Sequence, residues 1–275
     1  MRPEDYPSQE PFSEIGARYH AEVGRRGAGI TGAEFAYGEN PYQSLMVFRP
    51  QRPAGPVLLF FHGGGWTNGY KEWMAFMAPA MTAARIVFVS AGYRLAPKAV
   101  FPTGIMDAAA AVAWVHRRIA EHGGDPRRLF VGGHSAGGNY AALLAVRRDW
   151  QTALDLPRDV IRGCLPVSGV YSFTEDSGLS ARPRFLGPEG NGSERPASPL
   201  HNIQDKPPPF LLAYGSKDFP HLMRQAQDME RALTAAGGKA TRIVLEGCDH
   251  LSASYACGDA QGPWAKAAVK FMQGF

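Results

Sequence analysis

The sequence lacks several patterns that would place it in a specialised class of protein. Its 3 cysteines are too few for a disulfide scaffold and odd in number, so we expect a reducing compartment. It contains no run of four or more basic residues, and its formal net charge is only +4. A nucleic-acid partner is therefore not expected.

Long apolar runs are also missing. No stretch reaches the roughly 18 uninterrupted apolar residues that a membrane span needs, and the first dozen residues contain neither an apolar segment nor a small-residue cleavage site. We therefore expect a cytoplasmic protein without a membrane partner. The chain is nevertheless 45% hydrophobic over 275 residues, which is enough to bury a full core.

Short apolar runs alternate with longer helical patterns from residue 56 onward. This alternation is typical of strands buried on both faces, and it predicts an α/β fold with a mostly parallel twisted sheet and helices on both faces. We expect strands at 34–37, 45–49, 57–61, 86–90, 129–132, 163–167, 210–214 and 242–245, and helices near 14–23, 104–121, 136–148 and 220–236. The alanine-rich helix at 104–121 suits sheet packing, with a homo-oligomer contact as the alternative.

A serine lies between one of these strands and the next helix. Residues 133–137 read Gly-His-Ser-Ala-Gly. Such a turn strains the serine, places its hydroxyl above the sheet and needs glycines so that neighbouring backbone can pass. The helix that follows directs free N–H groups at a developing oxyanion. We therefore interpret Ser135 as a nucleophile rather than as a helix cap.

The base is expected after this serine, because chains with this turn order their catalytic residues as serine, acid and histidine. Ligand chemistry in such sheets also lies at the carboxyl ends of the strands. His250 follows the last expected strand and is the predicted base. His201, in a proline-rich loop, and His221, at the start of a helix, are interpreted as surface or rim residues.

The predicted acid is Asp218, which lies in the short segment after the strand at 210–214 and therefore at a carboxyl end of the sheet. Two alternatives are less suitable: Asp249 adjoins His250 and would usually point away from it, and Asp228 lies inside a helix. The acid would hold the imidazole in the tautomer that accepts the serine proton and would stabilise the imidazolium.

A glycine-rich loop follows the strand at 57–61. Residues 62–66 read His-Gly-Gly-Gly-Trp, the type of loop that supplies oxyanion N–H groups in lipases and esterases. Glycines suit this task because backbone amides must come within hydrogen-bond distance of the tetrahedral oxygen. We expect His62 to fix the loop rather than to act as the base.

With these residues in place, segment 56–256, roughly three quarters of the chain, resembles the hormone-sensitive-lipase-like and arylformamidase-like branch of the α/β-hydrolase superfamily. The resemblance rests on short motifs and single residues: His62–Trp66, Tyr93–Pro97, Phe101–Pro102, Asp107, Gly133–Asn139, Asp218 and His250. It implies an α/β-hydrolase fold over a single domain, residues 1–275, with an N-terminal cap or edge segment (1–54) and a catalytic core (55–275).

The resemblance also implies the roles of particular residues. The nucleophile, acid and base would be Ser135, Asp218 and His250. The oxyanion hole would be formed by the amides of Gly63, Gly64 and Ala136. Two positions depart from the lipase-like pattern, because Gly92 and Lys98 stand where acidic residues are usual. Residues 218–225 look like the segment after the acid in kynurenine formamidases, so the branch stays open.

We therefore expect a serine hydrolase that cleaves small acyl esters through an acyl-enzyme, with no metal and no organic cofactor. The alternative within the same chemistry is an arylformamidase, which cleaves amides of the N-formylkynurenine type. From another class, the alternative is a catalytically silent hydrolase fold used as a binding module.

Other signals in the sequence are weaker. An oxidoreductase would rest only on Gly27–Gly32, which matches G-x-G-x-x-G but follows no apolar strand. The identity of the acyl substrate depends on the pocket walls. Its candidates are aromatic residues near strand ends, namely Trp66, Tyr70, Phe219 and Tyr255.

Overall fold

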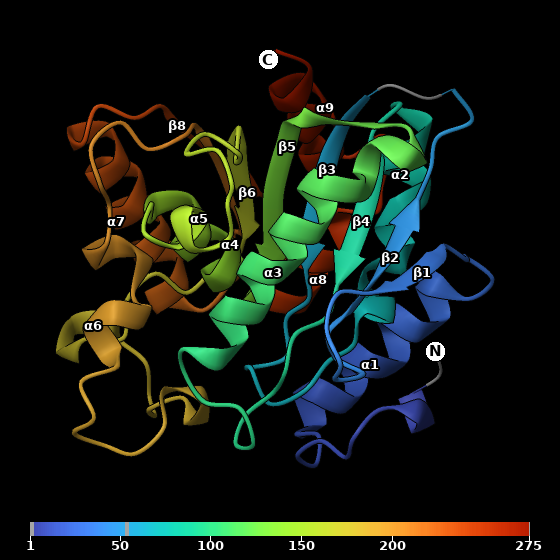
Figure 1. The fold of residues 1–275 in the computed structure, drawn as a ribbon. Coiled ribbons are helices and arrows are strands. Elements are labelled where there is room, and N and C mark those ends of the chain that lie inside the picture. Colours follow the sequence, from blue (N-terminus) through green and yellow to red (C-terminus); the bar gives the residue numbers. More distant parts are fainter. Residues whose placement is uncertain (1–2, 53–54, 275) are drawn as a thin grey trace.

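One eight-stranded sheet forms the centre of the computed structural model, which describes residues 3–52 and 55–274 (Figure 1). The strand order is β1-β2-β4-β3-β5-β6-β7-β8. The pairs β1–β2 and β2–β4 are antiparallel and the others are parallel, which confirms the predicted mostly parallel sheet. The strands are β1 (Ala33–Ala36), β2 (Ser44–Phe48), β3 (Gly55–Phe61), β4 (Val87–Ala91), β5 (Gly124–His134), β6 (Gly163–Val167), β7 (Phe210–Gly215) and β8 (Ala240–Leu245).

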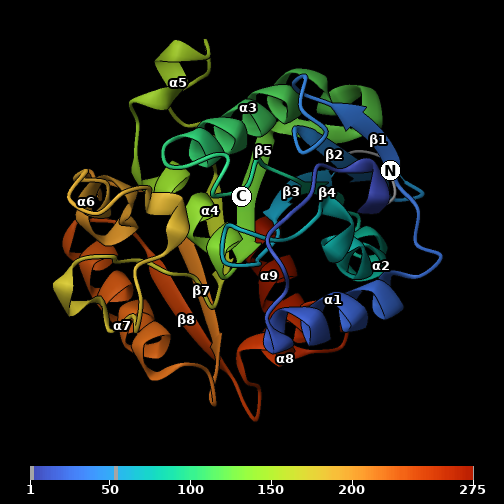
Figure 2. The same cartoon turned by 90° about the horizontal axis from the view of Figure 1, so that it is seen from below.

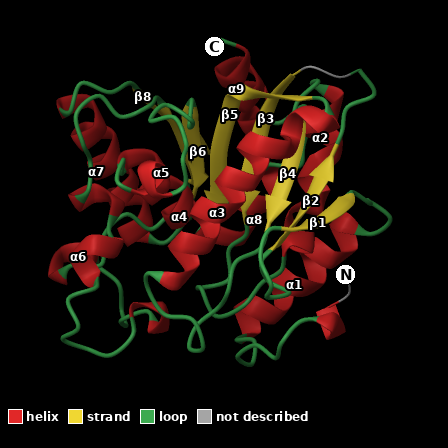
Figure 3. Ribbon diagram, viewed as in Figure 1, coloured by secondary structure: helices red, strands yellow, loops and turns green. Residues whose placement is uncertain are grey.

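Helices cover both faces of this sheet. Helices α3, α4 and α7 lie on one face, and α2, α8 and α9 lie on the other (Figures 2 and 3). The helices are α1 (Glu14–Gly27), α2 (Ala78–Ala83), α3 (Thr103–Arg118), α4 (Ala136–Val146), α5 (Trp150–Ala153), α6 (Glu194–Ala197), α7 (Pro220–Ala235), α8 (His250–Ala256) and α9 (Pro263–Gln273). None of the helices within the described residues is both long and apolar enough to cross a membrane.

Each expected strand and helix is present, and the differences have local causes. Strand β5 begins at Gly124 instead of residue 129, because the polar stretch Asp125–Arg128 hides its first half from an apolar pattern. Helix α9 was not expected, although its buried face, which includes Trp264, Ala268 and Met272, repeats every four residues. The pattern Gly27–Gly32 begins at the last residue of helix α1 and follows no strand, so the dinucleotide motif lacks its structural context.

Helix α4 is the most deeply buried helix of the fold. All of its residues from Ala136 to Val146 are buried, and it packs on β5 and β6. Burying a side chain such as Leu143 or Leu144 contributes about 1.5–3 kcal/mol. The first turn of α4 is therefore held firmly at the carboxyl ends of the central strands.

The N-terminal residues cross that same edge of the sheet. Strands β1 and β2 extend the sheet, and α1 lies below the carboxyl ends of the strands (Figures 1 and 2). The segment before α1 is anchored by the ammonium of Lys71, which donates to the hydroxyl of Tyr6 at 2.6 Å. It is also anchored by Gln9, whose side chain bonds both the amide and the carbonyl of Gly69.

Helix α4 can approach β3 closely only because its second residue, Gly137, has no side chain. A Cβ on Gly137 would lie 2.2 Å from the carbonyl oxygen of Phe61 and 2.4 Å from that of His62. Both obstacles are backbone atoms, so they cannot rotate away. The sheet and the helix must separate to accept any side chain at this position.

We therefore expect Gly137→Ala to lower the free energy of unfolding by about 3 kcal/mol or more, at the upper end of overpacking costs. Chemical denaturation measures the change. Gly24→Ala in α1 is the matched control, because nothing lies within 4 Å of its added Cβ. That variant gains about 0.5–1 kcal/mol from the better helix former. Equal stability of the two variants would contradict the proposed close approach.

Candidate active site

Ser135 stands at the turn between β5 and α4 with an unusual backbone conformation. Its φ is 53° and its ψ is −114°, which is strained for a residue with a side chain. Its amide donates to the carbonyl of Val167 on the neighbouring strand β6 at 2.9 Å. A Cβ on Gly133 would lie 2.3 Å from the backbone of Gly137, so the two ends of the turn pass too closely for any other residue.

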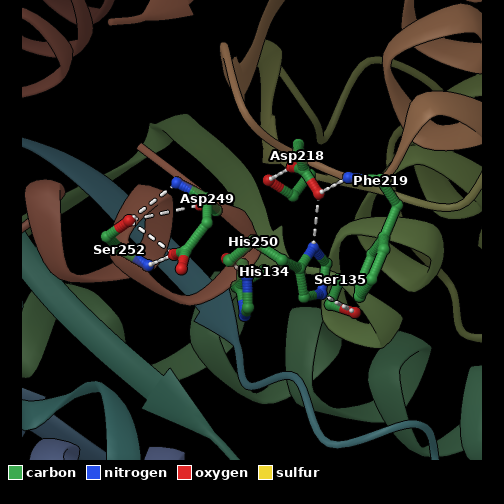
Figure 4. A network of polar contacts seen from close by, with 8 residues as sticks. His134, Ser135, Asp218, Phe219, Asp249, His250 and Ser252 are labelled. Carbon is green, nitrogen blue, oxygen red and sulfur yellow. Dashed lines mark hydrogen bonds and ion pairs between the residues drawn. The ribbon is translucent and has the colours of Figure 1, made fainter. Parts of the chain in front are cut away.

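Three predicted residues meet at this turn (Figure 4). The Nε2 atom of His250 lies 3.0 Å from the hydroxyl oxygen of Ser135. The Nδ1 atom of the same ring lies 2.9 Å from Oδ1 of Asp218. Because a carboxylate only accepts hydrogen bonds, Nδ1 carries the proton and Nε2 is left to accept from the serine. The arrangement is that of a nucleophile, a base and an orienting acid.

The carboxylate of Asp218 is buried and fully satisfied. Besides His250, it accepts from the hydroxyl of Ser168 at 2.5 Å and from the amide of Phe219 at 2.7 Å. Burial opposes the charged form, but the hydrogen bonds from His250, Ser168 and Phe219 outweigh it and hold the pKa of Asp218 below its usual value. The acid therefore stays ionised at neutral pH.

The alternative acids have other partners. The side chain of Asp249 accepts from the amide of Ser252 at 2.8 Å and forms a capping box at the start of α8 (Figure 4). That carboxylate points away from the imidazole of His250. Asp228 pairs with Arg231 on its own helix.

The other candidate histidines also lie outside this hydrogen-bond chain. His201 is near Ser172 and Thr174 at 3.3 Å from each hydroxyl, and His221 stacks on Phe219. His62 is fully buried, with its Nδ1 2.7 Å from the carbonyl of Gly63. Burial lowers the pKa of His62 to about 4, so the ring is neutral.

The glycine loop presents free amides beside the serine. A Cβ on Gly63 would lie 3.3 Å from the Cβ of Ser135, and one on Gly64 would lie 2.1 Å from the carbonyl of Asn68. Within the described residues, the amides of Gly63, Gly64 and Ala136 donate to no other part of the chain. Backbone donors left free around a nucleophile are what an oxyanion hole requires.

A cavity of about 540 Å³ opens onto Ser135 and His250. Its walls come from the segment before α1, from α1 itself, from the glycine loop and from residues 181–184. Glu10 and Arg184 form an ion pair that joins two of these walls. The lining is mixed, because Asn68, Arg182 and Arg184 stand among the aromatic side chains.

The four aromatic pocket candidates have different positions. Trp66 lines the cavity, where its ring stacks on Phe185 with centroids 4.1 Å apart. Phe219 does not belong to the lining, but its ring is 43% exposed and lies 5.0 Å from the His250 ring. Tyr70 and Tyr255 also stand outside the cavity lining.

Tyr70 is buried and Tyr255 is partly buried, and both pack against other aromatic rings. Tyr70 packs between Tyr6 and Trp73, and Tyr255 stacks on Tyr19 of α1 with centroids 5.6 Å apart. Tyr19 rather than Tyr255 reaches the cavity wall. Proximity to a strand end therefore did not determine which way each side chain points.

Two further residues at the site were not found from the sequence. Ser168, which holds Asp218, directly follows β6 and has a φ of 50°. Its place just after a buried strand is a signal that would have found it. His134, the second residue of the Gly-His-Ser-Ala-Gly turn, lines the cavity and contacts His250. The sequence alone offers no reason to expect a role for His134, because this position of the motif accepts different residues.

Comparisons with known proteins agree with this fold. A family model described as alpha/beta hydrolase fold matches residues 58–254. Esterase LipC of Mycobacterium tuberculosis is 31% identical over 86% of this chain and 63% of its own. A probable isoprenylcysteine alpha-carbonyl methylesterase of Arabidopsis thaliana is 29% identical over 78% of this chain and 49% of its own. The chain thus spans less than two thirds of the length of these relatives.

The solved structures show the same architecture. A variant of the esterase rPPE superposes with a TM-score of 0.72, at 26% identity, over 96% of this chain and 90% of its own. The family match covers most of the chain and includes Ser135, Asp218 and His250. The chain therefore belongs to the α/β-hydrolase fold family, in its hormone-sensitive-lipase-like group.

Proposed function

We propose that the protein is a carboxylesterase, a serine hydrolase that cleaves small acyl esters through an acyl-enzyme. The observation that carries this proposal is the unbroken hydrogen-bond chain from Ser135 through His250 to Asp218. The amides of Gly63, Gly64 and Ala136, which donate to no backbone carbonyl within the described residues, support the same proposal. The relatives named above are esterases, which supports the same chemistry for this chain.

The reaction proceeds in two halves. In the first, His250 Nε2 takes the proton of Ser135 as its oxygen attacks the ester carbonyl. The amides of Gly63, Gly64 and Ala136 bind the oxyanion, and His250 then gives its proton to the leaving alcohol oxygen as the C–O bond breaks. In the second, His250 activates a water molecule that hydrolyses the acyl-enzyme. Asp218 stabilises the imidazolium in both halves.

Two features support an ester over the alternatives. The relatives named above are esterases and none is a formamidase, so the amide reaction has no independent support. A silent binding module would not need to keep a strained serine, an ionised acid and three free amides together. Retaining all of them costs stability, which catalysis explains.

The shape of the site favours small acyl groups. The segment between β6 and β7 forms short turns and the four-residue helix α6, not a long amphipathic helix. The cavity it helps to close has polar side chains such as Asn68 and Arg182 in its lining. A long acyl tail would find little continuous apolar wall there.

The nucleophile assignment predicts that Ser135→Ala lowers turnover of nitrophenyl acetate by roughly a thousandfold or more, because only binding and the oxyanion hole remain. Thermal unfolding should show that the fold is retained. The control is Ser180→Ala, which changes an exposed serine and should leave turnover unaffected. More than a tenth of wild-type turnover in Ser135→Ala would exclude this serine as the nucleophile.

The choice of acid predicts a large difference between two aspartates. Asp218→Asn should lower kcat roughly ten-thousandfold, since the amide favours the wrong histidine tautomer. Asp249→Asn should stay near wild type, because asparagine caps a helix as well as aspartate does. Kinetics on one ester under identical conditions decide the ranking. The reverse order would assign the acid role to Asp249.

The pocket shape predicts the dependence on acyl length. With nitrophenyl esters, kcat/KM should be highest for acetyl to butyryl groups and should fall toward decanoyl. A lipase-like channel would do the opposite, since each buried methylene contributes about 0.8 kcal/mol. A steady rise to decanoyl would contradict the small-acyl proposal. N-formylkynurenine measured in the same series separates the formamidase alternative.

A further inference from the structure

His134 is a buried histidine that the mechanism above does not use. It ends β5, directly before Ser135, and its side chain is only 2% exposed. Its ring lies beside that of His250, with centroids 4.8 Å apart (Figure 4). A second imidazole next to the catalytic base is either a competitor for protons or part of its support.

The hydrogen bonds of His134 distinguish these two roles. Its Nε2 atom lies 2.9 Å from the backbone carbonyl oxygen of His250. A carbonyl only accepts, so Nε2 carries the proton and Nδ1 is left as a bare lone pair. That Nδ1 is buried without a partner. Burial lowers the pKa of His134 to about 3, so the ring stays neutral and does not compete for protons.

The ring has little freedom to move. It stacks on Tyr19 of α1 with centroids 5.6 Å apart, and the hydroxyl of Tyr19 bonds Ser254 of α8 at 2.8 Å. The glycine loop also packs against this ring, because a Cβ on Gly63 would lie 2.8 Å from Nδ1 of His134. Helix α1, the loop and α8 thus confine one imidazole from separate directions.

We propose that His134 is a positioning residue, which sets the angle of the His250 imidazole by holding the backbone carbonyl of His250 at the start of α8. This inference rests on the proposed hydrolase function. The imidazole must place one nitrogen at the serine oxygen and then at the leaving oxygen. A displacement of about 1 Å in such a group costs roughly a hundredfold in rate.

The path of the proton predicts how loss of the positioning role of His134 would affect different esters. As the Ser135 oxygen bonds to the carbonyl carbon, its proton passes to His250 Nε2, and the same proton passes to the leaving oxygen when the C–O bond breaks. A basic alkoxide needs that proton, whereas an acidic phenol departs as an anion without it. A misplaced imidazole therefore slows alkyl esters more than aryl esters.

Two variants distinguish the effect of losing the hydrogen bond from His134 to the His250 carbonyl from the effect of changing the side-chain volume. His134→Leu removes the donor, and His134→Gln keeps an N–H at similar reach. Acylation is measured as kcat/KM on ethyl acetate and on nitrophenyl acetate, which share one acyl group. We expect His134→Leu to lose about a hundredfold on ethyl acetate and less than tenfold on nitrophenyl acetate. His134→Gln should recover most of the loss.

Thermal unfolding of each variant checks that it folds, and His201→Gln, remote from the hydrogen-bond chain, is the control. Equal losses on both esters would overturn the proposal, because they indicate general damage or a damaged oxyanion hole. No loss in His134→Leu, or an equal loss in His134→Gln, would also overturn it.

A second measurement keeps this test separate from the ester proposal. A fluorophosphonate labels a serine that its histidine has activated, whatever the natural substrate is. If wild type labels at Ser135 but cleaves neither ester, the carboxylesterase proposal fails while the positioning role is still tested. Labelling should then be slower in His134→Leu and near wild type in His134→Gln. Unchanged labelling in His134→Leu would refute the positioning role.

Discussion

The positive φ of Ser135 is the constraint on which the rest of the site depends. Such a backbone conformation costs about 1–3 kcal/mol in a residue that has a side chain. The conformation persists only where the surrounding structure enforces it. Here the enforcement comes from a fully buried helix, α4, which follows the serine, and from the amide of Ser135, which is bonded to β6. The glycines at 133 and 137 allow the helix and strands to close around the turn.

Most polar groups around Ser135 are held in one protonation state, so they do not compete with His250 for the serine proton. Asp218 is ionised and saturated by donors from three segments, including Ser168 after β6. His62 and His134 are both neutral because burial lowers their pKa values to about 4 and about 3. His250, whose side chain is 15% exposed and opens to the cavity, is the histidine that we propose carries the proton during the reaction.

The strand and helix pattern is predictable from the sequence because its short apolar runs are continuous, as strands buried on both faces require. Ser135, Asp218 and His250 are predictable as a group because each lies within five residues of the end of a strand, at the carboxyl edge of the sheet. Side-chain direction is not predictable in this way: Tyr70 packs on Tyr6 and Tyr255 packs on Tyr19, and neither tyrosine lines the cavity. Gly92 is a similar case, because the carbonyl of Tyr42 fills the space of a Cβ there, 2.6 Å away, so the acidic residue usual at this position does not fit.

The central claim is that Ser135 forms a covalent acyl intermediate in this pre-strained site. The most direct test is rapid acid quench of wild type during turnover of nitrophenyl acetate, followed by mass spectrometry of the intact chain and of its peptides. The account predicts a burst of nitrophenol and one added acetyl group on the peptide that contains Ser135. Turnover without an adduct, or an acetyl group on any other residue, would contradict it.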